Sequence, residues 1–67
     1  MKKFVVACVD FDDNLVLEQH SANTWQEAVA KHSKCEDMFP DGVPDDKEDM
    51  QQEAFDQDCN VDFLEIS

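Results

Sequence analysis

The chain has 67 residues, enough for a single domain spanning 1–67, and it sets 17 acidic residues against five lysines for a net charge of −12. Nucleic acid and anionic membrane surfaces repel such a polyanion, so the composition argues against direct binding to either and favours a basic protein as partner. The 42% apolar content, with one Trp and five Phe, predicts a folded core rather than a disordered acidic tail.

The three cysteines, Cys8, Cys35 and Cys59, form an odd number with no CxxC pair. This usage argues against a secreted module held by disulfides, so we expect three structural thiols and a cytoplasmic location. The apolar run near the start stops at Asp10 and Asp12 without a signal-peptide cleavage site, and no run approaches the ~20 apolar residues of a membrane span.

The first half of the chain predicts a β-hairpin followed by a helix. Residues 3–9 are apolar on both faces and predict a central buried strand, the Asp/Asn-rich residues 10–14 predict a turn, and residues 15–19 predict a second strand. The segment from Thr24 to Glu27 fits the S/T-x-x-E capping box and predicts a helix as far as about Lys34. Helical spacing puts Trp25, Ala28, Val29, His32 and Cys35 on the face that packs against the sheet.

The second half predicts a loop, a helix and a last strand. Residues 36–44 hold both prolines and the only glycine and predict a loop, residues 46–57 predict a helix with Met50 and Ala54 on its apolar stripe, and residues 61–66 predict a strand. The fold class is therefore α+β, with a small antiparallel three-stranded sheet, two helices and the order ββααβ. The core residues expected from this layout are Phe4, Val6, Leu15, Leu17, Trp25, Val29, Phe63 and Ile66.

Most of the charge lies in residues 36–58, named here the acidic segment, which holds ten acidic residues against Lys47 for a local net charge of −9. Asp45, Asp49 and Glu53 recur every fourth residue and Asp56 follows three later, so a helix would align their carboxylates in one stripe. Like charges at this spacing destabilise a helix, which favours a binding role for them. The expected partner-binding residues are Glu36, Asp37, Asp41, Asp45, Asp46, Glu48, Asp49, Glu53 and Asp56. The open alternative is a solvated surface that only keeps the protein soluble.

The candidate metal, cofactor and catalytic residues of the chain each have an ordinary structural explanation. Asp10-x-Asp12-x-Asn14 and Asp56-x-Asp58-x-Asn60 begin like calcium loops, but both lack the glycine and the final glutamate of an EF-hand. The pair formed by His32 and Cys35 matches no zinc-ligand spacing, and a hydrogen-bonded histidine and a buried thiol are the expectation there. The single glycine excludes a phosphate-binding loop, and no nucleophile lies in a recognisable motif. We expect no metal, no cofactor and no enzymatic activity.

In size, acidity and the plan of a hairpin followed by the capped helix Thr24-Trp-Gln-Glu-Ala-Val-Ala-Lys-His32, the chain resembles small accessory proteins encoded by bacteriophages. Several anti-CRISPR and anti-restriction proteins of this kind are DNA mimics. The resemblance implies a non-enzymatic inhibitor, monomeric or homodimeric, that occupies a basic nucleic-acid-binding surface of a host protein. The alternative is a structural or assembly accessory that pairs through its sheet edge or apolar face.

Overall fold

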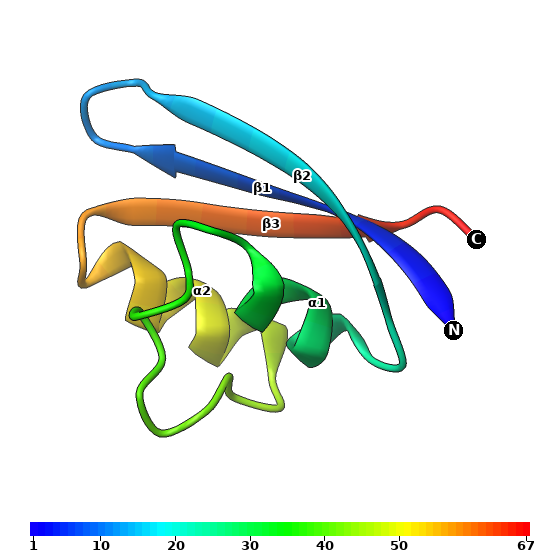
Figure 1. Cartoon of the computed structure of the whole chain (residues 1–67). Helices are drawn as coiled ribbons and strands as arrows, with labels where there is room; N and C mark the ends of the chain where they lie inside the picture. Colours follow the sequence, from blue (N-terminus) through cyan, green and yellow to red (C-terminus); the bar gives the residue numbers. More distant parts are fainter.

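The computed structural model describes residues 1–67 and consists of a three-stranded antiparallel sheet with two helices on one side (Figure 1). The elements are β1 (Lys2–Asp10), β2 (Leu15–Ala22), α1 (Trp25–Lys31), α2 (Lys47–Phe55) and β3 (Cys59–Glu65). The strand order is β2-β1-β3, which puts the first strand at the centre. The α+β class and the order ββααβ are confirmed.

The element boundaries differ modestly from the expected ones. The hairpin turn is closed by Asp10, whose carboxylate accepts hydrogen bonds from the backbone N–H groups of Asp12 (2.9 Å) and Asn14 (3.0 Å). Thr24 is the N-cap of α1, as its motif predicts, and its side chain accepts from the N–H of Glu27. This helix ends at Lys31 rather than at Lys34, because His32 adopts an extended conformation at its C-cap.

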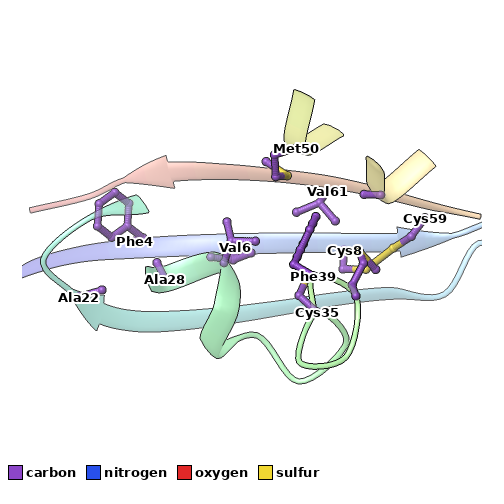
Figure 2. Close-up of a cluster of buried hydrophobic side chains, with 13 residues drawn as sticks. Phe4, Val6, Cys8, Ala22, Ala28, Cys35, Phe39, Met50, Cys59 and Val61 are labelled. Atoms are coloured by element: carbon purple, nitrogen blue, oxygen red, sulfur yellow. A yellow bond between two sulfur atoms is a disulfide. The ribbon is translucent and has the colours of Figure 1, made fainter. Parts of the chain in front are cut away.

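The core lies between the sheet and the two helices (Figure 2). Phe4, Val6 and Cys8 point inward from β1, and Val29 and Met50 meet them from the two helices. The other buried apolar residues are Ala22, Ala28, Cys35, Met38, Phe39, Ala54, Cys59 and Val61. Among the expected core residues, Phe4, Val6 and Val29 are therefore confirmed.

Aromatic side chains close the end of the core where the chain termini lie. Trp25 is half-buried and stacks on the ring of Phe63, with centroids 4.7 Å apart and planes at 6°. Phe4 meets the same ring edge to face at 6.4 Å. Trp25 and Phe63 thus pack against the core without being enclosed by it.

Leu15, Leu17 and Ile66 were wrongly expected in the core and are 56%, 61% and 44% exposed. Each lies in a segment that pairs with β1, and the register sets their side chains on the sheet surface that no helix covers. Successive residues of a strand alternate between the two faces of a sheet, so Val16, Glu18 and His20 take the inner face instead. The outer face of β2 thus carries both of its leucines, whereas its inner face carries its only charged residue, Glu18.

Cys8 and Cys59 form a disulfide between the neighbouring strands β1 and β3 (Figure 2). Both side chains point into the core, and their Cα atoms are 6.6 Å apart across 51 residues of sequence. The expectation of three free thiols is wrong for this pair, because the odd count and the spacing carried no information about which cysteines meet in the sheet. Cys35 remains a free, buried thiol.

Candidate functional site: the acidic segment

The acidic segment is fixed to the core at several points along its length. Met38 and Phe39 are buried, so the loop that follows α1 folds back beneath the sheet. The side-chain amide of Gln57 donates a hydrogen bond to the Met38 carbonyl at 2.7 Å, which ties this loop to the residues after α2. The loop and the helix therefore present their carboxylates as parts of one layer, on the helix side of the sheet (Figure 1).

The nine expected binding residues remain at the surface of this layer. All are exposed except Glu53, which is half-buried. Asp46 is the N-cap of α2, where its carboxylate accepts the N–H of Glu48 at 2.8 Å. Glu48 and Asp49 lie in the first turn of this helix, where negative side chains complement its dipole. Part of the acidity thus helps to start the helix as well as to charge the surface.

The expected stripe of carboxylates is only partly present. Asp45 precedes the N-cap and lies outside α2, so the expectation that it aligns with the helical carboxylates is wrong. Asp49 and Glu53 are one turn apart on the helix, and Asp56 follows as the C-cap, where its carboxylate accepts the side-chain amide of Gln52 at 3.1 Å. Glu48 lies about 100° around the helix from Asp49, because each residue turns the chain by that angle.

No carboxylate of the acidic segment forms an ion pair. The only cation of the segment, Lys47, points toward β3, where its Nζ lies 3.0 Å from the Asp62 carboxylate and 5.2 Å from the centre of the Phe63 ring. The hydrogen bond from Lys47 lowers the pKa of Asp62. The ten negative charges of residues 36–58 therefore have no neutralising partner within the molecule.

A shallow groove of about 530 Å³ runs between α2 and β3. Its polar lining comes from two carboxylates, Glu48 and Asp62, and from the side-chain amides of Gln51, Gln52 and Asn60. Its apolar lining is formed by Ala7, Val9, Phe55 and Val61. Phe55 is 53% exposed and meets Phe11 of the hairpin turn edge to face at 5.4 Å. The apolar floor of the groove can contact the methylene groups of a long side chain, and the carboxylates at its rim can bind the cationic end of that side chain.

His32 and Cys35 occupy structural positions. His32 is fully buried; its Nδ1 accepts the N–H of Lys34 at 3.1 Å, which assigns the ring proton to Nε2, and that group donates to the Val16 carbonyl at 3.0 Å. Burial raises the pKa of the Cys35 thiol to about 11, so the thiolate needed for metal binding or nucleophilic attack is disfavoured. No group of three or more His, Cys, Asp or Glu side chains is arranged to hold a metal ion.

The calcium-like motif at residues 10–14 also has a local structural use. Both carboxylate oxygens of Asp10 accept hydrogen bonds inside the hairpin turn, including one from the Asn14 side chain at 3.1 Å. The hydrogen bonds from Asn14 are the main cause that lowers the pKa of Asp10. This carboxylate is therefore committed to closing the turn.

The outer face of the sheet was missed by the sequence analysis. Besides Ile66, six apolar side chains of the strands gather there, and we name these six the open face: Val5, Ala7, Val9, Leu15, Leu17 and Leu64. Residues 3–9 are apolar on both faces of the strand. This pattern indicates that a second layer of protein could cover the outer side of the sheet as well as the side that faces the helices. The spacing of Leu15 and Leu17 predicts only that both lie on one face of the strand and does not distinguish the core side of the sheet from the outer side.

No protein-family model, curated protein or solved structure matches the chain. The resemblance to phage accessory proteins therefore stays a hypothesis. Neither α1 nor α2 has the length and apolar character that crossing a bilayer requires.

Proposed function

We propose that the protein is a non-enzymatic inhibitor whose acidic segment occupies a basic, nucleic-acid-binding surface of another protein. The observation that carries the proposal is that none of the ten carboxylates of residues 36–58 forms an ion pair. A surface serving stability alone would place lysines among them, whereas Lys47 is engaged by Asp62. Uncompensated charge of this density attracts a basic partner over long range and orients it during encounter.

The groove between α2 and β3 supports the same proposal at closer range. A lysine or arginine side chain of the partner can lay its methylene groups on Val9 and Phe55 while its charged end meets Glu48. A side chain bound in this way no longer contacts a phosphate group. The partner therefore loses a contact that it needs to hold nucleic acid. Inhibition in this scheme needs no chemical step by the small protein.

The test compares two triple variants of equal net charge. Asp45→Asn, Asp49→Asn and Glu53→Gln together neutralise three carboxylates of the acidic segment. The matched control, Asp12→Asn, Asp13→Asn and Glu65→Gln, neutralises three exposed carboxylates outside it. The parent and the control are expected to capture the same basic protein from a bacterial lysate, and the first variant is expected to lose it.

The captured protein is then titrated with duplex DNA in the presence of the parent chain. Competition is expected, and the affinity of the parent should fall at least tenfold between about 50 mM and about 300 mM salt as the charges are screened. Equal capture by both triple variants would contradict the proposal. So would a ternary complex in which DNA and the small protein occupy the partner together.

A further inference from the structure

The open face is an apolar surface that the fold leaves uncovered. Leu15, Leu17 and Leu64 are 56%, 61% and 66% exposed, and Val5, Ala7 and Val9 between them are half-buried by these neighbours. Both helices lie on the opposite side of the sheet (Figure 1). A contiguous apolar surface on so acidic a chain is typical of an interaction site.

The charge on this surface differs from the charge on the rest of the molecule. Among all outward-facing positions of the three strands, only Lys3 and Asp62 are charged, and they have opposite signs. The net charge of −12 therefore lies entirely outside this face. A basic partner is drawn to the acidic segment instead, and an anionic membrane is repelled by the whole molecule.

A second copy of the chain fits these conditions. Two open faces can meet without bringing excess charge into the interface, and the two acidic segments then lie on the outermost layers. Stacked sheets pack about 10 Å apart, and the helices add a comparable layer on each side, so the acidic segments are separated by more than the ~8 Å Debye length at physiological salt.

The face carries both a projection and a hollow. Ala7 and Leu17 are paired across β1 and β2, so the smallest side chain of the face adjoins a projecting leucine. A shallow hollow of about 170 Å³ lies on the other side of Ala7, bordered by Val5, Leu64 and the charged Asp62. The apolar part of the contact is therefore centred on β1 and β2, because Asp62 lies on the edge strand β3, where it is paired with Lys47.

Pairing through the strand edges is less available than pairing through the face. The ammonium group of Lys31 donates to the Ser21 carbonyl on β2 at 2.7 Å, and the amide of Gln51 donates to the Val61 carbonyl on β3 at 3.0 Å. Side chains thus occupy backbone groups on both edge strands, which hinders the addition of another strand. The open face has no such protection.

We infer that the protein forms a homodimer by packing its open faces together. Three strands of this length present roughly 350 Å² in projection. Two such faces meet over roughly 700 Å² in projection, which is below the size of a standard specific interface, so the dimer is weak, with a dissociation constant between about 10 µM and about 1 mM. The inference overlaps with the proposed function at one place, because Ala7 and Val9 of the open face also line the groove beside Glu48, whereas the other carboxylates of the acidic segment stay accessible in the dimer.

The test is the oligomeric state of the purified, disulfide-bonded chain by sedimentation equilibrium from about 5 µM to about 500 µM. The mass is expected to rise with concentration from 7.7 kDa toward twice that value. Raising the salt to about 1 M should strengthen the dimer, because it screens the repulsion between two acidic molecules. Binding of a basic partner by the acidic segment should respond to salt in the opposite direction, so the two proposals can fail separately.

Matched lysine variants locate the interface. Leu17→Lys lowers the net negative charge but places an ammonium group in the apolar contact, so it should weaken the dimer at least tenfold. Ala30→Lys makes the same charge change at an exposed position of α1 and should leave the dimer unchanged or slightly tighter. Leu64→Lys repeats the test on β3, and the circular dichroism spectrum of each variant verifies that it folds.

Amide NMR shifts on dilution provide the third measurement, with changes expected at Val5, Ala7, Leu17 and Leu64 and not along α2. A chain that stays monomeric at about 500 µM in about 1 M salt overturns the inference and leaves the open face to a different protein. Equal effects of Leu17→Lys and Ala30→Lys, or dilution shifts confined to the strand edges, overturn it as well.

Discussion

Glu18 is a carboxylate on the inner side of β2, held by groups from two parts of the chain. It accepts hydrogen bonds from the hydroxyl of Ser33, from the N–H of the same residue at 3.1 Å, and from the His20 ring at 2.8 Å. The Ser33 hydroxyl is the largest cause that lowers the pKa of Glu18 to about 2, followed by His20. The network fixes the turn after α1 to the edge strand.

This pKa shift predicts a specific loss of stability in acid. The folded pKa of Glu18 lies below its ordinary value of 4.5, so its stabilising effect is complete above that value and is lost as the pH falls toward 2. Urea midpoints measured across this range should fall steeply for the parent and less for Glu18→Gln or Ser33→Ala. The urea midpoints of the two variants should still fall somewhat with pH, because the pKa values of Asp10 and Asp62 are also lowered. Identical slopes in all three proteins would contradict the assignment.

The disulfide between Cys8 and Cys59 restricts the unfolded chain more than any other bond in the molecule. It closes a loop across 51 residues, for which the chain-entropy model gives a stabilisation of about 4 kcal/mol. Reduction should therefore lower the free energy of unfolding by up to that amount, as measured by urea titration with and without dithiothreitol. A double variant, Cys8→Ala with Cys59→Ala, should be insensitive to the reductant, whereas Cys35→Ala should respond as the parent does.

At the scale of elements, α1 is joined to β3 through the stacked rings of Trp25 and Phe63. Trp25→Ala should lower the free energy of unfolding by about 3 kcal/mol, the low end for removal of a large aromatic side chain, because the ring is only half-buried. Thermal unfolding followed by far-ultraviolet circular dichroism measures this loss. Gln26→Ala, a neighbouring substitution outside the stack, should cost far less.

The types and order of the elements could be predicted from the sequence because their signals are local. The capping box at Thr24, the cluster around Asp10 and the proline-rich loop each act within a few residues. The orientation of β2 could not be predicted, because only the covering helices decide which face becomes the core. Leu17 was expected in the core, but Glu18 lies on the inner face of the strand, where Ser33 supplies hydrogen bonds to its carboxylate.

The candidate site also combines features that local sequence patterns predict with features that depend on contacts between distant residues. Exposure of the acidic residues followed from their composition, but the start of α2 depends on which aspartate caps it. Asp46 takes that position and leaves Asp45 outside the helix. The disulfide required knowing that β3 lies beside β1, a contact between distant segments that no local pattern records.

At the scale of the whole molecule, the excess charge opposes the compact state. The acidic segment carries ten carboxylates that form no ion pair, so raising the salt from about 10 mM to about 300 mM should increase the urea midpoint. The variant with Asp45→Asn, Asp49→Asn and Glu53→Gln should start from a higher midpoint at low salt and gain less. A midpoint independent of salt in both proteins would show that the charges lie too far apart to repel.

The central strand pairs on one side with the nearby β2 and on the other with β3, which is distant in sequence. On the ribosome, β3 therefore emerges long after β1, since Cys59 follows Cys8 by 51 residues. Until then the hairpin has neither its third strand nor its full helical cover, and both of its apolar surfaces are open to other nascent chains. The complete sheet therefore forms only after nearly the whole chain has been made, because residues 59–65 must pair with a strand that was synthesised first.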